Sequence, residues 1–170
     1  MNIPARPRNR RAGINSRKGG SVSEEDGKVT TLDIEPYPLQ KVLGYSITRW
    51  EQDFAEVRLK LDEIHANRHG IPHGGIYCLL IDTASGFSGS YMPPGQPRRM
   101  AMTLSLAVNF VGQPKGTVLI ATGRKVGGGQ SNFFTEVELR CDEGVLVATG
   151  QGAMRYRKGY VDAPAKAEGS

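Results

Sequence analysis

One stretch of the 170-residue chain gathers residue types that polarise a carbonyl group. Asn67 and His73 flank a loop that ends in two consecutive glycines, Gly74 and Gly75. Helical periodicity begins at these glycines, and the free amides of a helix start carry partial positive charge that stabilises an anion or a developing oxyanion. Glycine also lets a substrate approach the backbone closely. The stretch is therefore a candidate for binding a reacting carbonyl.

Asp82 supplies a carboxylate that could act on such a carbonyl. It lies seven residues after Gly75, which is about two helical turns or roughly 10 Å along the axis. Its neighbours are apolar or small, and burying a carboxylate among them costs free energy unless it is paired. Taken by itself, Asp82 could be a solvent-facing or ion-paired residue, and Asn67 or His73 could simply cap a loop. Their spacing favours one common site.

The three histidines raise the question of a metal. His65, His69 and His73 are spaced four residues apart, as ligands on one helical face would be. Gly70 and Pro72 interrupt any helix through them. The sequence therefore predicts no metal site and assigns no role to His65 or His69.

Two helices should position these residues. Residues 36–44 indicate a short helix that ends at Gly44. From Gly74 to about Tyr91 the apolar spacing is helical, and a second face is small apart from its carboxylate. The apolar stripe predicted to face the core comprises Ile76, Leu79, Leu80, Thr83 and Phe87. The small face comprises Cys78, Asp82, Ser85, Gly86 and Gly89, and it could admit a bulky acyl group.

The remaining pattern is that of antiparallel strands. Phe54 to Leu61 alternates apolar and polar residues, and Gln52 and Asp53 can form the turn before it. One long helix covers only one face of a six-stranded sheet, so the other face is solvated or meets a partner. The expected strands are 45–50, 54–61, 102–111, 117–126, 132–140 and 145–156.

Charge and composition exclude several classes of partner. The first 18 residues hold six basic residues and no acid, which leaves 16 basic and 17 acidic residues in the rest. The body therefore lacks the basic surface of a nucleic-acid-binding domain. No apolar run reaches the ~20 residues of a membrane span, and no secretory signal is visible. Cys78 and Cys141 lie outside any paired motif, as in cytoplasmic proteins.

Domain boundaries follow from the same composition. Residues 1–28 are rich in Arg, Gly, Ser and Pro with almost no apolar periodicity, which is typical of a disordered tail. A tether or an organelle transit segment is the alternative for this tail. Residues 29–157 are expected to form one domain, and residues 158–170 a second disordered tail.

Together the motifs resemble the hotdog-fold thioesterases of the phenylacetate-pathway (PaaI) type. The run from Asn67 to Gly75, followed after six residues by Asp82, matches that family, and the resemblance covers about residues 36–157. It implies an α+β hotdog fold, with an antiparallel six-stranded sheet wrapped around one long central helix. It also implies hydrolysis of acyl-CoA without a cofactor, since coenzyme A is part of the substrate.

The resemblance implies a role for each motif. The Gly75 amide would polarise the thioester carbonyl, helped by Asn67 or His73. Asp82 would act as general base on a water or as nucleophile. Thr103 best matches a hydroxyl on the strand after the helix that holds the water. The glycines and Asp82 would come from different subunits, so the chain is expected to form at least a homodimer, and these dimers are expected to pair.

Two further points stay open at the level of sequence. Ser105 is the second choice for the hydroxyl, because a shift of one residue in strand register turns it to the other face. Coenzyme A needs a groove and cations for its phosphates, although ordinary solvated charges explain each cation equally well. The substrate-binding residues expected on these grounds are Gly74, Arg98, Arg99, Arg124 and Lys125.

Three other functions compete with hydrolysis. A hotdog hydratase or dehydratase would need a histidine and carboxylate spacing that is absent from this sequence. A non-catalytic acyl-CoA-binding protein would not need Asp82. An RNA-binding protein acting through the basic tail is disfavoured by the charge of the body.

Overall fold

The structure, a computed structural model, describes residues 35–93, 96 and 99–158. The tails expected over 1–28 and beyond Lys158 lie outside the described residues. The helical elements are α1 (Pro38–Leu43), a 3-10 turn η1 (Glu63–His65) and α2 (Gly74–Ser90). The strands are β1 (Ser46–Glu51), β2 (Phe54–Lys60), β3 (Ala101–Phe110), β4 (Val118–Gly128), β5 (Asn132–Cys141) and β6 (Leu146–Tyr156).

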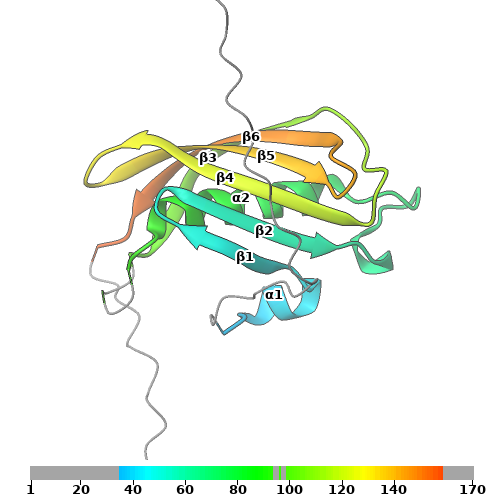
Figure 1. Cartoon of the computed structure of the whole chain (residues 1–170), viewed down its shortest axis with the longest axis horizontal. Helices are drawn as coiled ribbons and strands as arrows, with labels where there is room; N and C mark the ends of the chain where they lie inside the picture. Colours follow the sequence, from blue (N-terminus) through cyan, green and yellow to red (C-terminus); the bar gives the residue numbers. More distant parts are fainter. Residues whose placement is uncertain (1–34, 94–95, 97–98, 159–170) are drawn as a thin grey trace, which may run out of the picture.

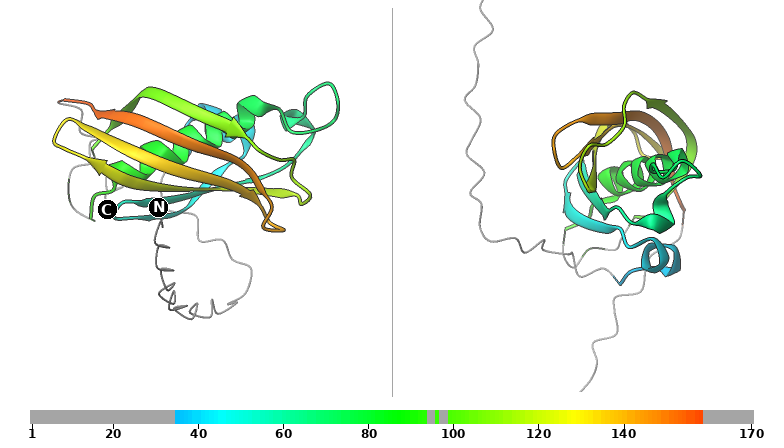
Figure 2. Two further views of the ribbon diagram at one scale, coloured as in Figure 1. Left: turned by 90° about the horizontal axis from the view of Figure 1, so that it is seen from above. Right: turned by 90° about the vertical axis from the view of Figure 1, so that its right-hand side faces the viewer.

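The six strands form one antiparallel sheet in the order β1-β2-β4-β5-β6-β3. The sheet curls around α2, which is seen end-on inside the curl in the right-hand view of Figure 2 and along its length in Figure 1. This arrangement confirms the predicted hotdog fold. No helix within the described ranges is both long and apolar enough to cross a membrane.

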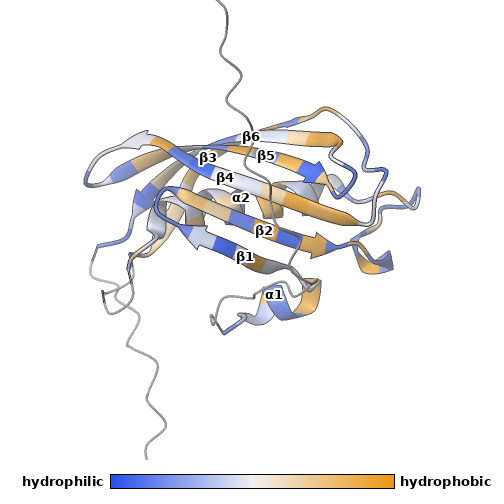
Figure 3. Ribbon diagram, viewed as in Figure 1, coloured by the Kyte–Doolittle hydropathy of each residue, from blue (hydrophilic) through white to orange (hydrophobic). Residues whose placement is uncertain are grey.

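Alternation of side chains sets the two faces of the sheet. Along β5 every second residue is buried against α2, and the bands of apolar and polar residues on the strands are visible in Figure 3. Period-two burial is what a strand with one face on the core requires. The other face of β5 is exposed, as expected for a sheet with a single covering helix.

The stripe of α2 predicted to face the core is confirmed at its apolar positions. Leu80 is fully buried, and the partly buried Ile76, Leu79 and Phe87 pack against the same hydrophobic core. Thr83 is only partly buried. The sheet curls closely around the helix, so the buried residues extend beyond one stripe. The buried residues of α2 are Tyr77, Leu80, Ile81, Ala84, Ser85 and Ser88.

Glycines in the strands make this close approach possible. A Cβ added at Gly123 on β4 would stand 2.5 Å from the Ala84 carbonyl oxygen. A Cβ added at Gly150 on β6 would stand 2.3 Å from Ile81 Cγ2. Both distances are well below van der Waals contact, so a side chain at either position would push the helix away from the sheet.

Strand β3 lies at the edge of the sheet beside α2. In the described part of the chain it pairs with β6 alone. Its large apolar side chains are open to solvent, with Leu104 53% and Phe110 57% exposed. A long edge strand with exposed apolar side chains can pair with another strand.

Candidate active site

The structure joins Asp82 on α2 to Thr103 on β3. The Thr103 hydroxyl donates a hydrogen bond to Asp82 Oδ1 at 2.6 Å. A hydroxyl bond to a carboxylate at this distance belongs to the stronger class of protein hydrogen bonds. It fixes the carboxylate and leaves Oδ2 with no hydrogen-bond donor among the described residues. Asp82 therefore has one oriented oxygen and one oxygen that can act on water or substrate.

A β-bulge gives Thr103 its orientation. Thr103 pairs with Met154 and Ser105 with Ala153, so the register shifts between the two hydroxyl residues. Met154 is fully buried on the inner face, whereas Ala153 belongs to the outer face. Paired residues share a face, so the two hydroxyls point to opposite sides. The structure thus brings Thr103, and not Ser105, to Asp82.

A buried tyrosine stands next to Asp82. Tyr45 is 2% exposed, and its hydroxyl is hydrogen-bonded to the hydroxyl of Tyr37 and to Thr83. Burial raises the pKa of Tyr45 above its ordinary value, and the bond to Tyr37 and the charge of Asp82 add to this shift. Tyr45 is therefore a neutral hydrogen-bonding group near enough to Asp82 to sense its charge.

His73 caps the N-terminus of α2. Its Nδ1 accepts a hydrogen bond from the Gly75 amide at 2.9 Å, and its carbonyl oxygen accepts one from the Ile76 amide at 2.9 Å. The Gly75 amide, expected to polarise the carbonyl, is thus bonded to a side chain of its own chain. The preceding amide, that of Gly74, has no acceptor among the residues described.

Asn67 shapes the loop before the helix. Its Oδ1 accepts from the His69 amide at 2.8 Å. Its own carbonyl accepts from the Gly70 amide and its amide donates to the Ile71 carbonyl, which closes a tight turn. Gly70 has a φ of 73°, which favours glycine. The side-chain NH2 of Asn67 has no acceptor within the described part of the chain.

His65 has a structural role instead of a place in the site. Its Nδ1 accepts from the Asp62 amide at 2.8 Å, and its Nε2 donates to the Leu43 carbonyl at 2.9 Å. It is buried and ties η1 to the end of α1.

A cavity of about 580 Å³ opens beside Asp82 and Thr103. Helix α2 contributes Asp82, Gly86 and Ser90, which lie at four-residue spacing and so share one face. Asp82 and Gly86 were predicted to share this face. The three aromatic side chains that line the cavity are Tyr37, Trp50 and Phe87.

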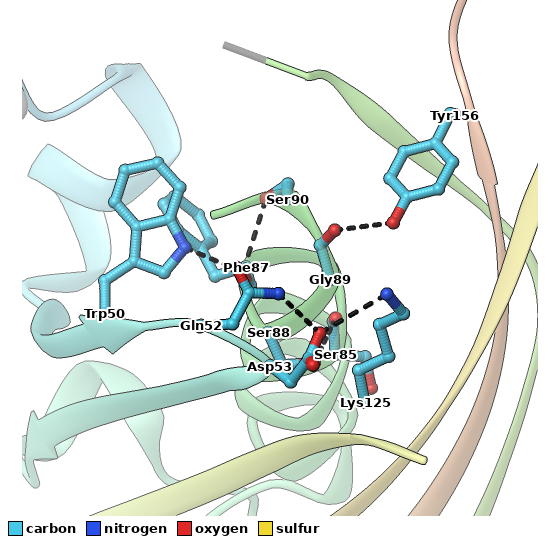
Figure 4. Close-up of polar contacts among 10 residues, drawn as sticks. All are labelled: Trp50, Gln52, Asp53, Ser85, Phe87, Ser88, Gly89, Ser90, Lys125 and Tyr156. Atoms are coloured by element: carbon cyan, nitrogen blue, oxygen red, sulfur yellow. Dashed lines mark hydrogen bonds and ion pairs between the residues drawn. The ribbon is translucent and has the colours of Figure 1, made fainter. Parts of the chain in front are cut away.

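Trp50 is fixed at the C-terminal end of α2. Its indole N–H donates to the Phe87 carbonyl at 2.7 Å, and its ring meets those of Phe87 and Tyr91 edge to face at 5.3 and 5.6 Å. The Tyr156 hydroxyl donates to the Gly89 carbonyl at 2.8 Å (Figure 4). These bonds satisfy carbonyls that the helix end leaves open. The aromatic part of the cavity wall is therefore anchored.

Tyr37 and Trp50 were not among the residues predicted to form the site. Both lie more than 30 residues before Asp82, and the curl of the sheet, which periodicity does not reveal, brings them to the cavity. The tryptophan was the only one in the chain, and an aromatic residue of that size is a signal that could have marked a cavity wall.

Arg99 lines the same cavity. Its guanidinium lies 3.5 Å from the centre of the Tyr156 ring and donates to the Gln130 carbonyl at 3.0 Å. Arg98, expected to act beside it, lies outside the described residues.

Arg124 and Lys125 lie at the far end of β4. The Arg124 guanidinium is stacked over Phe54 at 4.9 Å, and the Lys125 ammonium pairs with Asp53 at 3.3 Å (Figure 4). Neither is among the described residues that line the cavity beside Asp82. Of the expected cations that the structure describes, Arg99 is the one that lines this cavity.

Sequence comparison relates the chain to known esterases. The profile of the family described as "Thioesterase superfamily" matches residues 69–148. The Pseudomonas aeruginosa protein named "Putative esterase PA0474" is 31% identical over 117 residues, which cover 68% of this chain and 85% of that protein. "Putative esterase VNG_1336C" of Halobacterium salinarum is 25% identical over 130 residues, covering 72% and 86% of the two chains.

Solved structures share the fold. BH2602 of Bacillus halodurans, determined with CoA, superposes with a TM-score of 0.62 at 28% identity over 72% of this chain and 80% of that one. The E. coli PaaI protein from the phenylacetic acid degradation operon gives a TM-score of 0.61 at 22% identity over 70% and 83%. At that lower identity the likeness concerns the fold alone.

Proposed function

Because the chain belongs to the thioesterase superfamily, we propose that it hydrolyses acyl-CoA to the free acid and coenzyme A at Asp82. The observation that carries this proposal is the Thr103–Asp82 hydrogen bond at the edge of a cavity large enough for an acyl group. A carboxylate oriented by a hydroxyl beside a largely apolar cavity is suited to activating water near a bound acyl group.

The proposed reaction assigns one task to each group. Asp82 takes a proton from water, whose oxygen attacks the thioester carbon, or Asp82 attacks that carbon itself. In the second case the thiolate leaves behind an acyl-aspartyl anhydride, which water hydrolyses to the free acid and the regenerated carboxylate. The carbonyl oxygen gains negative charge, which is stabilised by a backbone amide at the N-terminus of an α2 helix. The intermediate collapses by breaking the carbon–sulfur bond, and the thiolate of coenzyme A leaves and takes up a proton. We assign the amide to Gly74, since His73 occupies that of Gly75.

Within one chain, the Gly74 amide and the Asp82 carboxylate are too far apart along α2 to act on the same carbonyl. Gly74 precedes Asp82 by eight residues, or about 12 Å along the axis. An amide–oxygen contact of about 3 Å, a C=O bond of about 1.2 Å and an attack distance of about 3 Å span roughly 7 Å. A bridging water extends this reach to less than about 10 Å. A second subunit would have to provide the amide.

A second copy of the chain paired along β3 would provide it. Thr103 near the start of β3 contacts Asp82, whereas Phe110 at its end lies against Gly74, where an added Cβ would stand 3.2 Å from the ring. A two-fold axis near the middle of β3 would set the Gly74 end of each copy opposite the Asp82 end of the other. Such pairing would also cover Leu104. We therefore propose a homodimer with two shared sites.

The proposal extends to the pairing of dimers and to the binding of the coenzyme A phosphates. Val126 and Phe134 are exposed on the outer face of the sheet, and pairing of dimers there would cover them. Coenzyme A needs cations for its phosphates. Arg99 lines the cavity and has no carboxylate partner among the described residues, whereas Lys125 is paired with Asp53.

Release of free thiol from a panel of acyl-CoAs tests the function. The full-length chain is incubated with straight and branched acyl-CoAs, and the thiol is followed with a chromogenic reagent. We expect turnover with kcat/KM of about 10⁴ M⁻¹s⁻¹ or more for the best substrate. Tight acyl-CoA binding without thiol release would identify a binding protein instead, and hydration of an enoyl-CoA would identify a hydratase.

Removing the Thr103 hydroxyl is expected to slow the reaction. Thr103→Val keeps the shape of the side chain but leaves Asp82 without its donor, and a hydrogen bond to a charged group contributes about 1.5–3 kcal/mol. We expect kcat to fall by about 10–100-fold with KM little changed. Thr103→Ser keeps the hydroxyl and is the matched control. Wild-type kcat in Thr103→Val would remove the proposed role of this residue.

A further inference from the structure

Three small residues of α2, Ser85, Gly86 and Gly89, lie on the face predicted to admit a bulky acyl group. Of these three, Gly86 alone lines the cavity. A Cβ added at Gly86 would meet no atom within 4 Å, and the residue lines the cavity beside Asp82. Gly89 differs, because a Cβ there would stand 2.1 Å from the Phe133 ring. Ser85 is fully buried in the core. Packing explains Gly89 and Ser85, but it does not explain the absence of a side chain at Gly86.

The position of Gly86 corresponds to a definite part of a bound acyl chain. It follows Asp82 by four residues, which is about 6 Å along the helix. With carbon–carbon bonds of about 1.5 Å, a zigzag chain advances about 1.3 Å per carbon. If the carbonyl carbon, counted as the first, lies beside Asp82, the fifth and sixth carbons lie beside Gly86. The cavity continues for another turn to Ser90.

The aromatic wall of the cavity cannot readily move to adjust its width. The indole of Trp50 is held by the Phe87 carbonyl and packs edge to face against Phe87. Closely packed aromatic rings with a satisfied N–H have a defined position. The space beside Gly86 is therefore set by the missing side chain.

Given the proposed hydrolysis, on which this inference rests, we propose that Gly86 sets the width of the acyl pocket and selects acyl groups broadened by a ring or branch at the fifth and sixth carbons. A straight chain would leave the space beside Gly86 unfilled, and unfilled apolar space forfeits contacts. A broad acyl group would fill it and be held with its carbonyl at Asp82.

Three acyl-CoAs and one substitution test the proposal. Acetyl-CoA is too short to reach Gly86, octanoyl-CoA is long and narrow, and 3-cyclohexylpropanoyl-CoA begins its ring at the fourth carbon. For the wild-type chain we expect kcat/KM with the cyclohexyl substrate to exceed that with octanoyl-CoA by about tenfold or more. Gly86→Val should lower the cyclohexyl value by about 10–100-fold and leave the acetyl value unchanged. Gly86→Ala should give an intermediate loss.

The outcomes separate this inference from the proposed function. A wild-type preference for octanoyl-CoA, or an equal loss on all three substrates in Gly86→Val, would overturn the inference while hydrolysis stands. If no thioester is cleaved, the proposed function fails, and the pocket is then tested by binding of the uncleavable thioethers S-(3-cyclohexylpropyl)-CoA and S-octyl-CoA. Weaker binding of the cyclohexyl thioether alone in Gly86→Val would support the width assignment, and equal weakening would reject it. Thermal unfolding of Gly86→Ala checks folding, because replacing a helical glycine by alanine should raise stability.

Discussion

Asp82→Asn is expected to lower kcat for acyl-CoA hydrolysis by about 10²–10⁴-fold and to leave acyl-CoA affinity within a few-fold of wild type. Asparagine has the size of aspartate, and its Oδ1 can still accept the Thr103 hydrogen bond that fixes the side chain. It can neither take a proton from water at neutral pH nor attack the thioester. The loss should therefore fall on kcat and not on KM.

The measurement pairs thiol release with binding of an uncleavable acyl-CoA thioether. Glu138→Gln is the matched control, because it removes an exposed carboxylate on the outer face of the sheet that pairs only with exposed Arg140 among the described residues. An exposed pair of this kind contributes little to stability. Wild-type turnover in Asp82→Asn would show that the mechanism uses another residue.

Asp82→Asn and Gly74→Pro are each expected to be nearly inactive alone. When the two variants are mixed, dimers that contain one chain of each are expected to regain activity. Proline at the first position of a helix is well tolerated and removes one donor, the amide of Gly74. His73 has φ −67° and ψ 136°, a conformation that a following proline permits. Loss of one oxyanion donor is expected to lower kcat by about 10²–10³-fold.

Restoration follows from the shared site. In a mixed dimer, one site receives both substitutions and the other receives the intact Asp82 of one chain and the intact Gly74 of the other. Random mixing makes half of the dimers mixed, and each has one intact site of two, so about a quarter of wild-type sites should return. Sites contained within single chains would return none.

Gly74→Ala is the control for the proline variant. It brings a Cβ to the same place, 3.2 Å from the Phe110 ring, but keeps the amide N–H. We expect it to retain most of the activity that Gly74→Pro loses. Equal losses in both variants would assign the effect to packing against Phe110. Absence of restoration in mixed dimers, confirmed by tagged co-purification, would reject the shared site.

The elements that depend on local sequence were predictable. Alternation located β2, short apolar runs between turns located the other strands, and helical spacing located α2. These signals are local because the periods of strand and helix are properties of consecutive residues. The wrap of the sheet around α2 is also confirmed, but it was implied by the family resemblance and not by these local patterns.

The parts that depend on distant residues were not predictable. The buried face of α2 is selected by Gly123 and Gly150, which lie on strands that follow the helix in the chain. The choice between Thr103 and Ser105 depends on a bulge that alternation does not reveal. The bond from the Gly75 amide to His73 depends on side-chain geometry at the helix start.

Helix α2 packs closely against glycines of the strands on one side and borders the cavity on another. The two sides therefore differ in how well they tolerate substitutions. A methyl group at Gly123 or Gly150 would collide with α2, so that side of the helix can vary only together with the sheet. At Gly86 a new side chain enters open space. Substrate preference could therefore diversify through single substitutions on the cavity side while the scaffold remains unaltered. A randomised library confined to positions 83, 86 and 90 should yield many folded proteins with altered substrate ranges.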